Sequence, residues 1–183
     1  MRYTGVIICS LVLCCFSTES IAWDQAEINA GIKAHKMALS ADGRYVLVAD
    51  HTPHSLLVLD ASTLQPIKSI EVQNSEGNRS RVNHVYTAPP RESFIATLQD
   101  MPEIWQISYA DEPPVGFDGW VHDYRVDSGE NSEPEPFPVR RIKVDAPLND
   151  LTFDQEYVLL TGMTATGEQQ MIDLDLGRVV GAN

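Results

Sequence analysis

From about residue 35 onward, short apolar runs alternate with clusters of turn-forming residues. Residues 44–49 and 55–60 are rich in Val and Leu, and residues 66–72 alternate apolar and polar side chains. Runs of this length, bounded by Gly, Pro, Ser or Asp, predict β-strands. Further predicted strands span residues 82–87, 93–98, 103–109, 139–144, 150–153, 157–161, 170–174 and 178–180. The pattern therefore predicts an all-β protein.

The predicted strands recur in sets of four. A similar tripeptide marks the third strand of each set: Val58-Leu-Asp60, Ile107-Ser-Tyr109 and Ile172-Asp-Leu174. Repeats of about 40–50 residues with four strands each are typical of β-propeller blades. A β-sandwich can show similar strand spacing, but it gives no reason for the same strand order to recur. The favoured fold is a partial β-propeller of about three four-stranded blades, of which the first could lack its inner or outer strand.

Three blades are too few to close a propeller, because closed rings have at least four. An open stack leaves apolar blade faces exposed at both ends, which is costly for a monomer. We therefore expect the ring to be completed either by remaining blades or by a second copy of the chain.

The second set contains a long insertion at residues 110–138 that is rich in Asp, Glu, Pro and Gly. Its prolines oppose regular strand pairing. Its acidic residues do not follow the spacing of an EF-hand calcium loop. We expect an excursion from the blade rather than a separate domain.

Residues 1–22 differ in character from the rest. Gly5–Phe16 is a continuous apolar run, and Ser20-Ile-Ala22 then places small residues at the positions that a signal peptidase requires. The run is shorter than the roughly 20 residues of a membrane span, so an uncleaved anchor is the less favoured alternative. We expect cleavage before Trp23, a periplasmic or secreted domain at residues 23–183, and no membrane span after cleavage.

Charge and cysteine content exclude several classes of function. The net charge of -13 repels phosphate backbones, so no nucleic-acid partner is expected. The three cysteines (Cys9, Cys14 and Cys15) all lie in the predicted leader. The mature domain would therefore have no disulfide, no thiolate zinc site and no attachment site for a c-type haem.

Several segments resemble those of one known family. They are residues 31–72, Ser80-Arg-Val82, Ala88-Pro-Pro-Arg91 and Pro102-Glu-Ile-Trp105, and the most telling are Asp60-Ala-Ser-Thr-Leu-Gln-Pro66 and Phe153-Asp-Gln-Glu-Tyr157. The resemblance is to the haem d1 propeller family, which includes the d1 domain of cytochrome cd1 nitrite reductases and related haem d1 biosynthesis proteins. It extends over about residues 31–180 but covers under half of that family's ring. These segments concern blade architecture rather than catalysis.

The resemblance implies an iron ligand. In the family, a histidine at the inner edge of a blade is the proximal ligand and precedes an S-A-x-G-R-Y motif. His35 precedes Ser40-Ala-Asp-Gly-Arg-Tyr45 with the same spacing, which implies that His35 binds the metal. The turn at residues 60–66, however, resembles the family's next blade, where no ligand histidine is expected. The alternative is a histidine that faces the channel without a metal.

Two further residues are implied as cofactor contacts. His51 lies in a loop where family members place haem-contacting side chains, and its alternative is a solvent-exposed loop histidine. Arg81 begins an inner strand, where a guanidinium could pair with the carboxylates of a tetrapyrrole. The other cationic candidates are Arg91, Arg140 and Arg141, of which the last two are more typical of an outer strand.

The resemblance therefore implies a domain that binds haem d1 or a related tetrapyrrole, linked to haem d1 assembly or to nitrite reduction. A reductase needs a second redox centre, and the mature chain has no cysteine to attach a c-type haem, so assembly or binding is favoured. The alternative is a non-catalytic β-propeller interaction protein or a truncated remnant. Whether the chain is an enzyme stays open.

Overall fold

The computed structural model describes residues 34–50, 54–74, 76–113 and 135–182. The predicted leader, His51 and the centre of the insertion lie outside these ranges, so what was expected of them stays a prediction. The strands are β1 Ala34–Leu39, β2 Tyr45–Asp50, β3 Ser55–Asp60, β4 Pro66–Glu71, β5 Val82–Ala88, β6 Ser93–Leu98, β7 Glu103–Ser108, β8 Val139–Lys143, β9 Leu148–Phe153, β10 Leu159–Thr164, β11 Gln169–Asp173 and β12 Arg178–Ala182, and a 3-10 helix η1 covers Pro89–Arg91.

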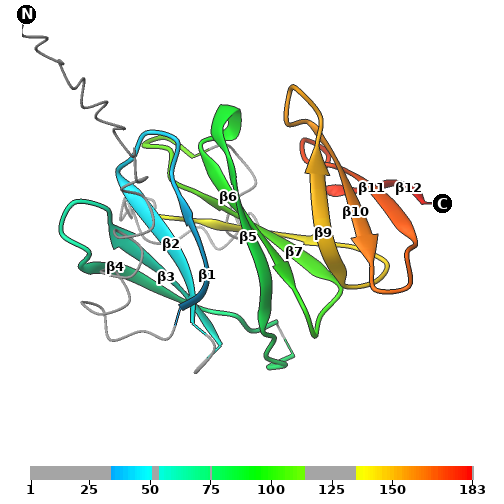
Figure 1. Ribbon diagram of the computed structural model, residues 1–183, viewed down its shortest axis with the longest axis horizontal. Helices are drawn as coiled ribbons and strands as arrows, with labels where there is room; N and C mark the ends of the chain where they lie inside the picture. Colours follow the sequence, from blue (N-terminus) through cyan, green and yellow to red (C-terminus); the bar gives the residue numbers. More distant parts are fainter. Residues whose placement is uncertain (1–33, 51–53, 75, 114–134, 183) are drawn as a thin grey trace, which may run out of the picture.

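The strands form three four-stranded antiparallel sheets, each of which follows the chain from its first to its fourth strand. Figure 1 shows the sheets side by side, as blades, in the order β1–β4, β5–β8 and β9–β12, without closure into a ring. The predicted all-β partial propeller is confirmed. One expectation is wrong: the first blade lacks neither its inner nor its outer strand, because β1 pairs with β2 and β4 pairs with β3.

The first strand of each blade is its innermost strand. The Thr87 hydroxyl of β5 donates a hydrogen bond to the Leu39 carbonyl at the end of β1, at 2.7 Å. The Asn83 amide of β5 donates to the Leu148 carbonyl of β9, at 3.3 Å. Side chains thus connect the first strands of adjacent blades, as at the central axis of a propeller.

Two hydrophobic cores join the three blades, and the middle blade contributes to both. Along β6, Phe94 and Ala96 pack toward the first blade, whereas Ile95 between them packs toward the third. All six residues of this strand are buried, which explains why it carries no charged side chain. The principal partners are Leu47, Leu56, Val58, Trp105 and Ile107 in the first core, and Ile104, Ile142, Leu148, Leu151, Leu160, Ile172 and Leu174 in the second.

The tripeptide marks lie at the ends of the equivalent third strands β3, β7 and β11, with Tyr109 and Leu174 directly after theirs. Their apolar side chains were expected to pack between blades or within blade faces. Leu59, Trp105, Ile107, Ile172 and Leu174 are fully buried, and Leu57 is half-buried. This prediction is confirmed.

The turn from the third to the fourth strand repeats its chemistry in the first and third blades. The carboxylates of Asp60 and Asp173 each accept hydrogen bonds from the backbone N–H groups two and three residues further on, at 2.8–2.9 Å. A left-handed residue follows, Leu64 (φ 58°) in the first blade and Gly177 (φ 64°) in the third. In the second blade the insertion at residues 110–138 occupies this place, between β7 and β8.

One strand begins later than its sequence predicts. Residues 157–161 were expected to form a strand, but β10 begins at Leu159. Tyr157 has a φ of 56°, and the Asp154 carboxylate accepts the Val158 N–H at 2.9 Å. This turn chemistry takes precedence over the strand propensity of Tyr and Val.

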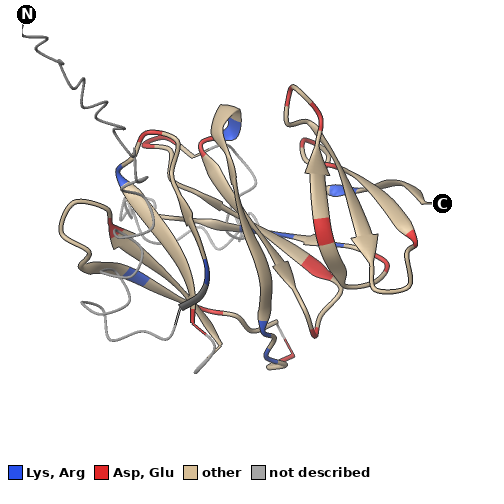
Figure 2. Cartoon of the chain, viewed as in Figure 1, with Lys and Arg blue, Asp and Glu red and all other residues tan. Residues whose placement is uncertain are grey.

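Figure 2 shows that most Asp and Glu residues in the described parts of the chain lie in turns at the two ends of the strands. This placement keeps charge out of the two cores and in contact with solvent. Within the described ranges, the structure has no helix long and apolar enough to cross a membrane.

Candidate functional site

The first strands of all three blades carry a β-bulge at the same place. The pairing with the second strand skips one residue in each: His35 in β1, Asn83 in β5 and Asn149 in β9. Each is the second residue of its strand. A bulge leaves one residue outside the ladder and re-aims its side chain. The inner edge of the blades therefore has three equivalent bulged positions at the end where these strands begin.

The bulged asparagines connect the second and third blades. Nδ2 of Asn83 lies 3.3 Å from the backbone carbonyl oxygens of Leu148 and Asn149, and 3.4 Å from the side-chain oxygen of Asn149. The bulged residue of one blade thus contacts the bulged residue of the next. His35 occupies the same backbone position one blade earlier; its side chain is outside the described part of the chain.

A second connection along the inner edge joins Tyr86 to Asp150. The Tyr86 hydroxyl donates to the carboxylate at 2.9 Å and accepts the Leu151 N–H at 3.3 Å. Burial, and secondarily the hydrogen bond to Asp150, raises the pKa of Tyr86 to about 12. The phenol is therefore neutral at ordinary pH and acts as a donor.

Alkaline pH should weaken this connection. Because the folded pKa of Tyr86 lies above the ordinary value of 10.0, ionisation favours the unfolded chain, and stability present below pH 10 is lost as the pH rises toward 12. We expect the free energy of unfolding of the native protein to fall between pH 10 and pH 12 more steeply than that of Tyr86→Phe. Urea unfolding of both proteins across this range measures the difference, and parallel pH profiles would contradict the assignment.

Arg81 lies immediately before β5, at the same end of the blades, and it is paired. Its guanidinium donates to both carboxylate oxygens of Asp100, at 2.9 and 2.5 Å, and its backbone N–H donates at 3.0 Å. The hydrogen bonds from Arg81 hold the pKa of Asp100 at about 2. The arginine side chain keeps 41% of its surface exposed. Arg81 is therefore oriented by Asp100 while part of its guanidinium stays accessible.

A further histidine, His54, lies toward this end of the first blade. His54 directly precedes β3, and its charge helps to lower the pKa of Asp100. His51 lies outside the described residues, in the same loop. The structure thus brings Arg81, Asp100 and His54 together, and β1 brings the backbone of His35 to the same end.

The other cationic candidates connect parts of the fold. Arg91 donates to the Asp175 carboxylate at 2.7 Å, and Arg140 donates to the carbonyl oxygens of Leu174 and Asp175 at 2.6 and 3.0 Å. The guanidinium of Arg141 lies 4.7 Å from the centre of the Trp105 ring. Arg91 and Arg140 therefore attach the second blade to a turn of the third.

Sequence reasoning missed Asn83, Asn149 and Asp100. Only Asn83 carries a signal that could have found it, because it stands second in the predicted strand 82–87, whereas the predicted strand 150–153 begins after Asn149. Asp100 carries no such signal, since its role follows from its contact with Arg81. Among the described residues, no cluster of three or more His, Asp or Glu could hold a metal ion by itself.

Residues 19–130 match the family model described as the cytochrome D1 heme domain. The chain belongs to this family. The resemblance inferred from the sequence is thereby confirmed. A dihydro-heme d1 dehydrogenase of Pseudomonas aeruginosa is 34% identical over 153 residues, which are 83% of this chain and 27% of that protein. The d1-family chain thus spans about a quarter of the length of this relative.

Solved structures agree with the family and the fold. The structure of dihydro-heme d1 dehydrogenase NirN in complex with DHE matches with a TM-score of 0.64 and 33% identity, over 80% of this chain and 27% of that one. Hydrazine synthase of Kuenenia stuttgartiensis matches with a TM-score of 0.56 and 17% identity, over 82% of this chain and 36% of that one. The Myceliophteria thermophila Cps50 (Swd1) β-propeller domain matches with a TM-score of 0.50 and 14% identity, over 81% of this chain and 40% of that one. The last two matches show the propeller fold alone.

Proposed function

We propose that this d1-family domain contributes to a binding site for a haem d1-type tetrapyrrole at the end of the blades where β1, β5 and β9 begin. One observation carries the proposal: the repeated bulge sets His35, Asn83 and Asn149 at equivalent positions on the inner edge. The family match and the similarity to a NirN structure that contains DHE support the class of ligand.

The residues at this end of the blades fit such a group. A tetrapyrrole presents carboxylates, which suit a guanidinium, and a metal, which suits an imidazole. Arg81 supplies the guanidinium, oriented by Asp100, and His35 is the proposed iron ligand. Asn83 supplies an amide on the adjacent blade. When bound, the iron would supply the redox chemistry, and the residues of this chain would bind and orient the macrocycle.

We assign the domain to haem d1 assembly rather than to nitrite reduction. The similarity to a dihydro-heme d1 dehydrogenase over 83% of this chain supports this assignment. His51 remains a proposed contact, because the loop that contains it continues into His54 near Asp100.

Adding haem d1 to the purified protein should shift the Soret band of the ligand and raise the melting temperature, because a ligand that binds only the folded state stabilises it. His35→Ala should abolish both effects, and added imidazole should restore the Soret shift. Arg81→Ala should weaken binding by about tenfold, the loss expected for a charge-assisted hydrogen bond. Lys36→Ala, one position further along β1, is the matched control and should bind as the native protein does.

If haem d1 and ordinary haem both leave the native melting temperature unchanged, the proposal fails and the interaction-protein alternative takes its place.

We also propose that the outward face of the third blade packs against a second copy of the chain. Its apolar side chains include Met163, Met171 and Val180, which are 44%, 43% and 45% exposed. Two pairs on this face are uncharged, Thr152 opposite Thr161 and Thr161 opposite Met171, and Asp150 lies opposite Met163. The other face of the same sheet is buried against the second blade. A face of this composition can pair with itself about a twofold axis.

Sedimentation velocity tests this contact. The native protein should associate as its concentration rises into the range of about 10–100 μM, and the double variant Met163→Lys with Met171→Lys should stay monomeric, because four facing lysines would repel one another. Leu176→Lys is the control, since this exposed residue lies in the turn after β11 and not on the face. A native protein that is monomeric throughout contradicts the contact.

A further inference from the structure

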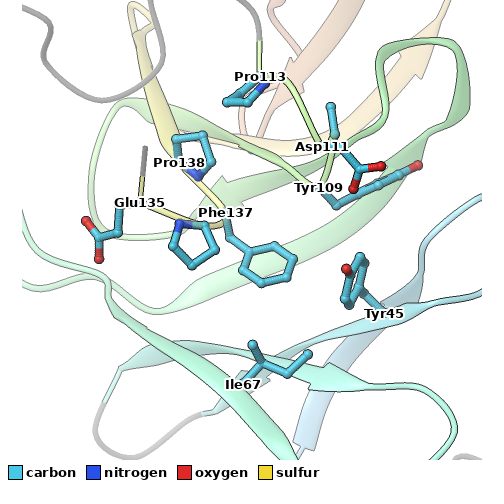
Figure 3. Close-up of a pocket in the computed structure, with 10 residues that line it drawn as sticks. Tyr45, Ile67, Tyr109, Asp111, Pro113, Glu135, Phe137 and Pro138 are labelled. Atoms are coloured by element: carbon cyan, nitrogen blue, oxygen red, sulfur yellow. The ribbon is translucent and has the colours of Figure 1, made fainter. Parts of the chain in front are cut away.

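A cavity of about 340 Å³ lies between the first and second blades (Figure 3). It is at the opposite end of the strands from Arg81. Tyr45 begins β2 beside it, and Tyr109 follows the last residue of β7. Six-residue strands span about 20 Å, so a whole strand length separates this cavity from the proposed tetrapyrrole site. The cavity therefore belongs to a different site. Its volume lies at the lower end of the range typical of small-molecule pockets.

Rigid aromatic groups form the inner wall of the cavity. The rings of Tyr45 and Phe137 meet edge to face with their centres 4.9 Å apart. Tyr109 is 4% exposed, and its oxygen accepts the Ala41 N–H at 3.1 Å. Figure 3 shows the side chains of Tyr45, Ile67 and Phe137 converging from the two blades. Aromatic rings held in this way have little freedom to rearrange, and they favour the binding of a flat apolar group.

The charged groups that line the cavity are all acidic. Asp111 and Glu135 are its only charged lining residues among those described, and they are 83% and 73% exposed at the rim. Two cations of the chain already contact these walls from outside. The Arg44 guanidinium lies 5.1 Å from the Tyr45 ring centre and 3.2 Å from Asp111. The Lys68 ammonium lies 2.7 Å from the Pro136 carbonyl oxygen and 3.1 Å from Glu135.

These contacts indicate what the cavity can bind. Aromatic faces and carboxylates both attract cations. Among the described lining residues, an anionic ligand would meet two carboxylates and no cationic group. A neutral apolar molecule would leave the rim carboxylates unused.

We propose that this cavity binds a small organic cation with an aromatic body, of the arylalkylamine class. The aromatic ring lies against Tyr45 and Phe137, and the ammonium group reaches Asp111 at the rim. The surface ion pair between Asp111 and Arg44 opposes binding little, because exposed pairs contribute roughly 0–1 kcal/mol.

Ligand titration of the full chain, followed by NMR, tests the proposal with 2-phenylethylamine as the probe. Saturable shifts are expected, with the aromatic signals of Tyr45 and Phe137 among those that move. Asp111→Asn should weaken the affinity by at least about threefold, the loss of a modest exposed ion pair or cation–π contact. Glu112→Gln is the matched control, because it removes an equal charge from the adjacent residue, which does not line the cavity. Its affinity should stay native.

Two further measurements test whether binding depends on the positive charge of the ligand and whether it is independent of the tetrapyrrole site. Phenylacetate has the same ring with the opposite charge and should show no saturable binding. His35→Ala should leave the affinity for 2-phenylethylamine unchanged, since His35 lies at the other end of the blades. The proposal is overturned by the absence of saturable shifts with the amine, by equal binding of phenylacetate, or by equal losses in Asp111→Asn and Glu112→Gln.

Discussion

Replacing Trp105 with alanine is expected to lower the free energy of unfolding by about 3–5 kcal/mol, the usual cost of removing a large aromatic side chain from a core. Trp105 is the largest fully buried side chain of the described residues, and it belongs to the core that joins the first two blades. Its Nε1 donates to Glu103 at 3.0 Å, and Arg141 packs on its ring. The substitution therefore removes packing, a hydrogen bond and a cation–π contact together.

Urea unfolding followed by circular dichroism measures this loss. Tryptophan fluorescence is unsuitable, because the substitution itself removes a fluorescent side chain. Leu176→Ala is the control, because it truncates an apolar side chain in the turn after β11, where it is 56% exposed. This control should change the free energy of unfolding by no more than about 0.5 kcal/mol. Similar losses in the two variants would show that the core between the first two blades is not packed as described.

Gly177→Ala should destabilise the third blade by about 2–4 kcal/mol, which combines backbone strain with the loss of the hydrogen bonds from Arg140. Gly177 has a φ of 64°, a conformation that costs alanine roughly 1–2 kcal/mol. A methyl group at this position would also collide with the guanidinium of Arg140. That guanidinium would have to leave the carbonyl oxygens of Leu174 and Asp175.

Gly167→Ala separates these two causes. Gly167 has a φ of 90° in the turn between β10 and β11, and a methyl group there would contact nothing within 4 Å. Both variants therefore carry backbone strain, but only Gly177→Ala also displaces Arg140. Chemical unfolding should show the larger loss for Gly177→Ala, and Arg140→Ala should remove most of the difference. Equal losses would mean that the arginine contact contributes nothing measurable.

The candidate site was predictable in part. The resemblance to the d1 family pointed to His35, and the place of Arg81 before an inner strand follows from its apolar neighbours. The equivalence of His35, Asn83 and Asn149 became visible only through strand pairing, because a bulge is defined by the partner strand and not by the bulged residue. The same holds for Asp100, which lies 19 residues from the arginine it orients.

The sequence by itself determined the local features of this protein. Alternation of apolar and polar residues specifies strands, and the side chains of Asp60 and Asp173 specify the turns that follow them, because both depend on interactions within a few residues. The blade repeat follows from these local signals in recurring order. Tertiary structure alone decided which polar groups meet, as Arg91 meets Asp175 across 84 residues and Asn83 meets Asn149 across 66. Such contacts depend on how one blade is set against the next, and that arrangement results from the packing of both cores rather than from any segment of the chain.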